Sequence, residues 1–244
     1  SWDEVRTTRL LARRLEEAGW RVTRLPRTGL VAEIGTGGRV VALRADIDAL
    51  PVQDATDDPW RSTVAGVAHA CGHDVHTTAL LGAGLVLAEL HAAGELATGV
   101  RLVFQPAEEV QPGGALDVMK AGAMDGIGRI FALHCDPKVD VGRIGSRIGP
   151  ITSASDEITV VLTGPGGHTS RPHLTADLVY ALVQVITQVP AVLGRRLDPR
   201  SGVNLTWGAV QSGSAHNAIP ASGSVRAISM PTSEPMAPDV QTFW

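Results

Sequence analysis

Strand-like and helix-like segments alternate along residues 3–134, and this order restricts the possible folds more than any other feature. Short β-type runs fall at 29–34, 39–45, 100–104 and 129–134, and helical periodicity covers 3–18, 75–93 and 114–120. The run at 39–45 is mostly apolar, as expected for a strand buried on both faces. The alternation predicts an α/β domain in which a mostly parallel sheet is flanked by helices.

A second, smaller domain is predicted after the Gly- and Pro-containing stretch at 142–150. Strand-like runs at 157–162 and 203–210 enclose a Gly-rich turn and a helical segment at 174–189, which together suit an α+β domain. We therefore expect a first domain at 1–152, an α+β domain at 153–228 and a tail at 229–244. The tail is rich in Pro and lacks periodicity, so we expect it to be disordered or atypical.

Composition excludes several classes of protein. With 44% hydrophobic and 19% charged residues the chain can bury a core, and its net charge of −4 provides no concentrated basic face for nucleic acid. No continuous apolar run reaches the roughly 18 residues of a membrane span. The two cysteines cannot form a disulfide framework and both lie beside histidines, which favours a reducing compartment, so we expect a cytoplasmic protein.

Polar clusters follow three of the predicted strands. Asp46 and Asp48 come after the run at 39–45, Glu108 and Glu109 after the run at 100–104, and His134 ends the run at 129–134. In open α/β sheets, ligands bind outside the carboxyl ends of the strands. We therefore expect these clusters to meet at one edge of the sheet.

The segment His69–His76 has the highest density of candidate metal ligands. Cys71 and His73 can face one ion across Gly72, and Asp74 is a candidate acceptor that would fix an imidazole tautomer. The alternative is a polar helix N-terminus that is capped by Asp74. For Glu108-Glu109 the alternative is a solvated loop, and for His134 it is a packing or capping contact.

Taken jointly, the clusters favour a metal site over these separate alternatives. Cys71, His73, Glu109 and His134 supply sulfur, nitrogen and oxygen donors that suit Zn²⁺ or a similar first-row ion. Two adjacent carboxylates strain each other electrostatically, so one of them needs a nearby cation. If Glu109 is the ligand, Glu108 is free to act as a general base.

Several segments together resemble a known family. They are Leu43–Pro51, His69–Thr77, Pro106–Glu109, Leu133–His134, Gly164–His168 and His216–Pro220. They are similar to the metal-dependent amidohydrolases, the aminoacylase-like metallopeptidases that include hippurate hydrolase, N-acyl-amino-acid amidohydrolases and plant auxin-conjugate hydrolases. The resemblance extends to about Arg226.

The resemblance implies a catalytic domain with two divalent metal ions and an inserted lid domain that mediates homodimerisation. The implied ions are Zn²⁺ or Mn²⁺, with Co²⁺ or Ni²⁺ also suited, and the implied substrate is an N-acyl amino acid or a similar conjugate. The implied metal ligands are Cys71, His73, Glu109 and His134, with Glu108 as general base, Asp48 supporting a ligand, His168 and Asn217 contacting substrate or oxyanion, and His173 as a further substrate-binding candidate.

Two alternatives follow from the comparison with this family. The sequence lacks the family's first helix and its return to the catalytic domain, which brings a last histidine ligand, so one expectation is a truncated, inactive remnant that at most binds metal or dimerises. The other is a dipeptidase or carboxypeptidase with the same chemistry. The Cys71-Gly72-His73 form favours the acyl-amino-acid branch.

Overall fold

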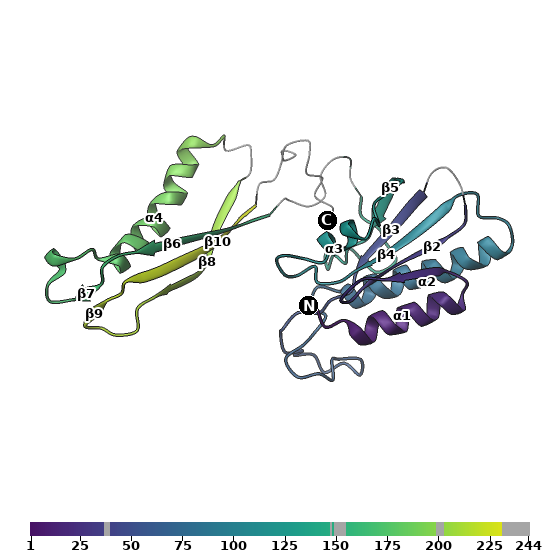
Figure 1. Ribbon diagram of the computed structural model, residues 1–244, viewed down its shortest axis with the longest axis horizontal. Coiled ribbons are helices and arrows are strands. Elements are labelled where there is room, and N and C mark those ends of the chain that lie inside the picture. The colour runs from purple at the N-terminus through teal and green to yellow at the C-terminus, as the bar shows by residue number, and fades with distance from the viewer. Residues whose placement is uncertain (37–39, 147, 149–154, 199–202, 231–244) are drawn as a thin grey trace. The chain divides into compact units, whose positions relative to one another are not determined.

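The computed structural model describes residues 1–36, 40–146, 148, 155–198 and 203–230. The chain divides into two compact units, Ser1–Arg143 and Ile144–Trp244 (Figure 1). The predicted boundary after residue 152 lies outside the described residues. So does the predicted tail at 229–244, apart from Ser229 and Met230, which end a strand and so contradict a tail at these two positions.

The first unit contains a five-stranded sheet in the order β1-β2-β4-β3-β5. Its strands are β1 (Arg21–Arg24), β2 (Leu30–Ile34), β3 (Val40–Asp46), β4 (Gly99–Gln105) and β5 (Ile127–Ala132). The predicted α/β class is confirmed: β3 is parallel to β4 and β5, and the exception is β2, which is antiparallel to both of its neighbours, β1 and β4. The connection between β1 and β2 is too short for the crossover that parallel strands need.

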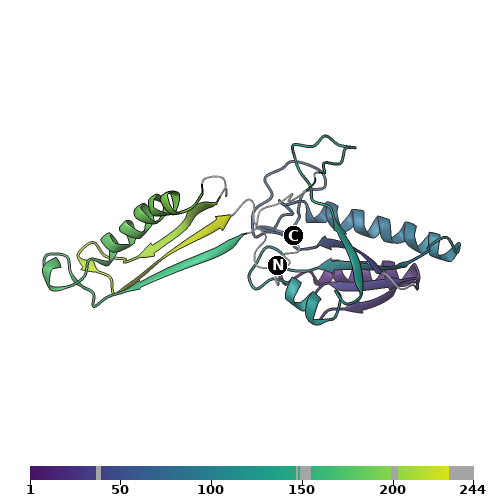
Figure 2. The same ribbon diagram turned by 90° about the horizontal axis from the view of Figure 1, so that it is seen from above.

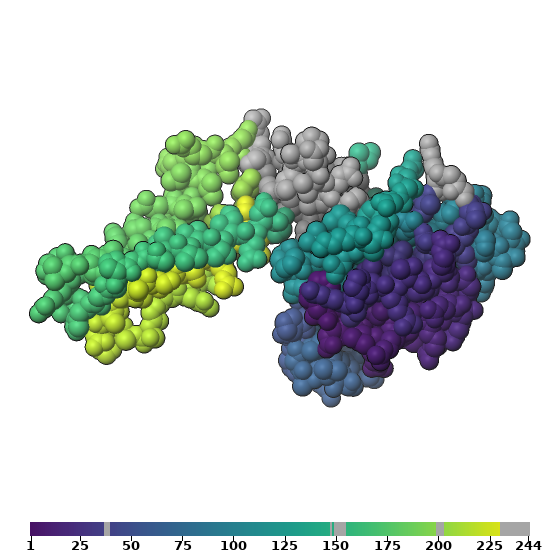
Figure 3. Space-filling model, in the orientation of Figure 1, coloured from purple at the N-terminus to yellow at the C-terminus, as the bar shows by residue number. Residues whose placement is uncertain are grey.

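Helices cover both faces of this sheet. Helices α1 (Val5–Glu17) and α2 (His73–Ala92) pack on one face, where their apolar side chains meet Leu30, Leu102 and Phe104 in the main core. The short helix α3 (Ala115–Lys120) packs on the other face. The loop at 51–67 is largely exposed and lies on the surface of the unit (blue in Figure 3).

The parallel part of the sheet brings the predicted polar clusters to one edge. Strands β3, β4 and β5 are neighbours that run in the same direction, so their carboxyl ends share that edge. Strand β5 ends at Ala132, two residues earlier than predicted. His134 therefore lies in the segment that follows the strand and does not end the strand itself.

The second unit contains a three-stranded antiparallel sheet with one long helix on it. Strand β10 (Ser222–Met230) is the centre of the sheet and pairs with both β6 (Asp156–Thr163) and β8 (Asn204–Ser212). Helix α4 (Leu178–Arg196) lies along one face (Figure 2), where Leu178 and Leu182 pack on Val225. The helix begins later than predicted because Asp177 caps it by accepting the backbone N–H of Tyr180 at 3.0 Å.

Within the part of the chain that the structure describes, two helices, α2 and α4, are long and apolar enough by length and composition alone to cross a membrane. The search for continuous apolar runs in the sequence does not find these helices, because they meet the criterion through their mean hydropathy and contain polar residues as well. Both helices pack on a sheet, as the core helix of a globular domain also does. Length and composition are therefore weak evidence for a membrane segment here.

Candidate metal centre

The centre is built around the first turn of α2. Gly72 precedes the helix with φ 81°, a conformation that glycine adopts without a steric penalty. A Cβ at this position would also lie only 3.0 Å from the Cys135 side chain. His73 and His76 then share one face of the helix at i, i+3 spacing, and they are only 1% and 4% exposed.

Asp48 orients the imidazole of His73. The Nδ1 atom of His73 lies 3.0 Å from the backbone oxygen of Asp48 and 3.2 Å from its Oδ1, so Nδ1 carries the proton in this arrangement. The Nε2 atom then presents a lone pair, and it lies 3.7 Å from Glu109 Oε1 and 4.0 Å from Glu108 Oε2. A carboxylate behind a histidine whose other nitrogen faces further donors is typical of metal sites.

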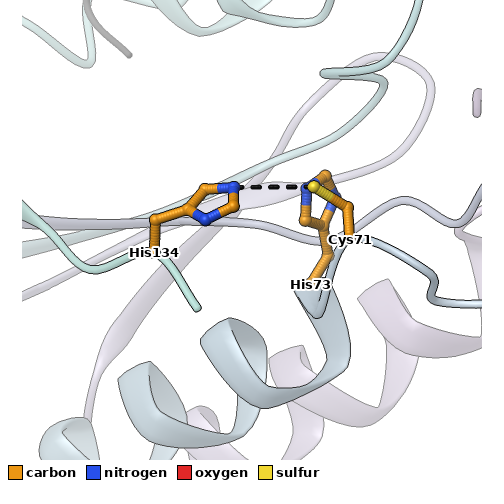
Figure 4. Close-up of side chains that lie close together, drawn as sticks. All are labelled: Cys71, His73 and His134. Carbon is orange, nitrogen blue, oxygen red and sulfur yellow. Dashed lines mark hydrogen bonds between the residues drawn. The ribbon is translucent and has the colours of Figure 1, made fainter. Parts of the chain in front are cut away.

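Cys71, in the turn before α2, and His134, in the segment after β5, both lie close to His73. The Cys71 Sγ atom lies 3.5 Å from His134 Nε2, and Figure 4 shows these two side chains pointing toward each other. Ligand atoms of Cys71, His73 and His134 lie within 4.8 Å of one another, and the same holds for His73, Glu108 and Glu109. The structure therefore brings together all four predicted ligands and the predicted base, with His73 common to both groups.

Electrostatics at the centre are dominated by burial and by the carboxylates. Burial, Glu109 and Asp46 raise the pKa of Glu108, against the opposing effects of Arg44 and His73. Burial and the nearby carboxylates, Glu109 first, raise the pKa of the Cys71 thiol to about 11. Such a concentration of negative charge around a thiol and two imidazoles is suited to a divalent cation.

The pKa of Asp48 is held well below its ordinary value. Burial alone would raise it, but hydrogen bonds from His73, from Ser1 and from the backbone amides of Glu109 and Glu108 outweigh burial. The amide of Glu109 donates to Asp48 Oδ2 at 3.1 Å. Asp48 therefore fixes both an imidazole and the backbone of the Glu-Glu pair.

Sequence patterns did not identify the partner of His76. Its Nδ1 donates to Asp46 Oδ1 at 2.6 Å, and its Nε2 accepts the backbone N–H of Cys135 at 2.8 Å. This chain of buried groups links β3 to the segment that carries His134. Asp74, the predicted acceptor for an imidazole, is exposed, and Asp46 and Asp48 accept from the imidazoles instead. The i, i+3 spacing of the two histidines was the available signal.

The remaining predicted residues lie in the second unit. Strands β7 (Gly167–His168) and β9 (Ala218–Ile219) pair so that His168 is opposite Ala218, and the N–H of Thr169 donates to the backbone oxygen of Asn217 at 3.2 Å. The structure thus brings His168 and Asn217 close together. His168 Nδ1 accepts the backbone N–H of Ser170 at 3.1 Å. His173 is exposed in the short 3-10 helix η1 (Pro172–Leu174).

An α/β sheet with sulfur, nitrogen and oxygen donors at its carboxyl edge, and a second carboxylate beside them, defines a candidate site for metal-assisted hydrolysis. The chain belongs to peptidase family M20/M25/M40, whose family model matches residues 42–223. This membership agrees with the predicted resemblance.

Individual relatives match most of this chain. A Rhodococcus jostii protein named as a glutamate–cysteine ligase is 50% identical over 225 residues, which are 91% of this chain and 28% of that protein. The N-acetylcysteine deacetylase of Bacillus subtilis is 39% identical over 224 residues, which are 90% of this chain and 58% of that protein.

A solved structure extends the similarity to three dimensions. A Bacillus subtilis protein described as a dinuclear metal-binding peptidase of the M20 family superposes with a TM-score of 0.73 at 34% identity. The match covers 95% of this chain and 59% of that one. The chain therefore spans less than two thirds of the length of these relatives.

Proposed function

We propose that this chain is the metal-binding part of an amidohydrolase that cleaves the amide bond of N-acyl amino acids, with two divalent ions, Zn²⁺ or Mn²⁺. The observation that carries the proposal is the His73 imidazole, which Asp48 holds so that Nε2 faces the Glu108-Glu109 pair. The named activity of the deacetylase relative supports the substrate class, and N-acetylcysteine is the first substrate to test.

The donor set suits such ions. Cys71, His73, Glu109 and His134 would hold them, since thiolate, imidazole and carboxylate are established ligands of Zn²⁺ and carboxylates also suit Mn²⁺. When bound, divalent ions of this kind lower the pKa of a water molecule and polarise the substrate carbonyl.

Glu108 is the residue for proton transfer. Its carboxylate takes a proton from the attacking water and returns it to the nitrogen of the leaving amine. Its raised pKa makes the carboxylate a stronger base for the first transfer than an ordinary carboxylate. Asp48 acts behind it, by fixing His73 and the amide of Glu109.

Roles for the second unit are part of the same proposal. His168 and Asn217 would contact the substrate, with His168 donating to the oxyanion of the tetrahedral intermediate, and His173 is a further substrate-binding candidate. Homodimerisation through the second unit and a cytoplasmic location complete the proposal.

The variant Glu108→Gln tests the assigned base. We expect hydrolysis of N-acetylcysteine and N-benzoylglycine to fall by about 10²–10⁴-fold while bound metal is unchanged. Glu95→Gln, at an exposed position, is the matched control. Near-normal rates in Glu108→Gln would contradict the assignment. A wild-type chain that binds metal and hydrolyses neither substrate would support the inactive remnant, and preferential cleavage of dipeptides would support the dipeptidase.

A further inference from the structure

A buried carboxylate, Glu4, lies outside the metal-ligand groups and has no role in the proposed chemistry. Glu4 immediately precedes α1 and is 7% exposed, but its side chain does not cap the helix. Instead Oε1 accepts the backbone N–H groups of Trp2 at 2.8 Å and of Ala107 at 3.2 Å, and Oε2 accepts the hydroxyl of Thr28. The carboxylate therefore connects the start of α1 to the segment that follows β4.

Ala107, the residue that Glu4 holds, has an unusual backbone. Its φ is +46°, in the left-handed region that residues with a Cβ disfavour, and it is completely buried. It directly precedes Glu108, so its backbone angles set the direction in which the Glu108-Glu109 pair leaves β4. Hydrogen bonds hold both of its polar groups: the N–H donates to Glu4, and the oxygen accepts the N–H of Gly114 at 3.0 Å.

Close packing around Pro106 also restricts the turn at 106–107, which follows β4 and is called the corner below. A Cβ on Gly114 would lie 2.0 Å from the backbone oxygen of Pro106, and a Cβ on Gly29 would lie 2.5 Å from its Cδ. The N–H of Gly29 in turn donates to Thr8 Oγ1 of α1 at 2.8 Å. The corner therefore has little room to move, and α1 contacts it through both Glu4 and Thr8.

We propose that Glu4 is a positioning residue for the catalytic pair, because its carboxylate holds Ala107 in the left-handed conformation that aims Glu108 and Glu109 at His73. On the other side of Glu108, the amide of Glu109 donates to Asp48. Buried carboxylates thus hold the backbone before and after Glu108. This inference rests on the proposed roles of Glu108 and Glu109.

Substitutions at both ends of the contact test the proposal. Glu4→Ala removes the acceptor, whereas Glu4→Gln keeps an oxygen for the Ala107 N–H and an amide that can donate to Thr28. The double variant Glu4→Ala/Ala107→Gly places glycine where a positive φ is needed, so that the conformation no longer depends on Glu4. Glu17→Ala, exposed at the other end of α1, is the control.

The readouts are Co²⁺ affinity, followed by the absorption of the Co²⁺-thiolate complex, and kcat and KM for N-acetylcysteine. We expect Glu4→Ala to weaken Co²⁺ binding and lower kcat by about 10–100-fold with KM little changed, as for other residues that support metal ligands. Glu4→Gln should stay close to wild type, and the double variant should recover part of both losses. If Glu4 only stabilised the fold, a glycine at position 107 would not restore the Co²⁺ affinity and kcat that Glu4→Ala loses.

Wild-type Co²⁺ affinity and kcat in a folded Glu4→Ala variant would overturn the proposal, and so would a double variant no better than Glu4→Ala. If Glu4→Ala does not fold, Thr28→Val decides, because it removes one hydroxyl that fixes the carboxylate; unchanged Co²⁺ affinity there overturns the proposal. If the wild type hydrolyses nothing, the proposed function fails, and Co²⁺ affinity alone still tests the role of Glu4.

Discussion

The Cys71 thiol shows how a single residue depends on the charges around it. Burial and then Glu109, Glu108 and Asp46 raise its pKa to about 11 from an ordinary 9.0. In the metal-free Cys135→Ala variant we therefore expect Cys71 to react with iodoacetamide about 100-fold more slowly at pH 7 than an ordinary thiol, and to accelerate until pH approaches 11. A profile with its midpoint near 9 would contradict this picture.

Asp48 is the residue whose loss should weaken metal binding without removing a ligand. The Asp48→Asn variant loses the charged acceptor of the His73 Nδ1–H, so we expect metal affinity to fall by about 10–100-fold. Competition with a chromophoric chelator measures the change. Asp74→Asn is the control, since Asp74 follows His73 in the same helix and its side chain is exposed. Equal metal affinities in the two variants would argue against an orienting role for Asp48.

At this scale the sequence identifies the groups that carry chemistry better than the groups that support them. Cys71, His73 and the Glu-Glu pair stand out because few structural roles need these residue types together. Glu4 does not stand out, because an acidic residue before a helix is already explained by the helix dipole. Its contact with Ala107 depends on a turn 103 residues away, which only the folded chain brings near.

Three charged side chains, one on each of three neighbouring strands, form ion pairs that stabilise the sheet of the first unit. Glu33 on β2 lies opposite Arg21 on β1 and Arg101 on β4, and it bonds to them at 2.6 and 2.7 Å. The Arg21 guanidinium, together with Arg101, outweighs burial and holds the pKa of Glu33 below its ordinary 4.5.

A pKa lowered on folding means that Glu33 stabilises the folded state fully above pH of about 4.5, and that this contribution disappears as pH falls through the lower folded-state value. We expect Glu33→Gln to lower the free energy of unfolding by about 1 kcal/mol at pH 7. The difference from wild type should shrink in acid, as measured by urea unfolding at several pH values. A difference that stays constant down to pH of about 2 would contradict the assignment.

The elements could be predicted where apolar periodicity is strong and less well where the tertiary structure decides. Helix α2 and strands β2 to β4 follow their predicted positions within a few residues. β1 was not predicted, because its sequence Arg21–Arg24 has little apolar character and its pairing with β2 supplies the stability. Strand β10 was not predicted either, although it is the centre of the second sheet, where its pairing with β6 and β8 supplies the stability.

At the scale of the whole molecule, metal binding should stabilise one unit selectively. All residues of the candidate centre lie in Ser1–Arg143, so ions that bind only the folded form should raise the unfolding temperature of this unit alone. At 100 times the dissociation constant the gain is about 2.7 kcal/mol. Calorimetry with and without Zn²⁺ measures this, and single-tryptophan variants that keep Trp20 in the first unit or Trp207 in the second assign each transition. An equal shift in both units would contradict it.

The most direct test of the metal centre is the metal content of the chain, measured by mass spectrometry after purification without chelators. We expect close to two first-row ions per wild-type chain, as in the solved relative described as dinuclear, and a large loss in His73→Ala, since His73 belongs to both ligand groups. A wild-type content no higher than that of His73→Ala would contradict the assignment of these residues as a metal centre.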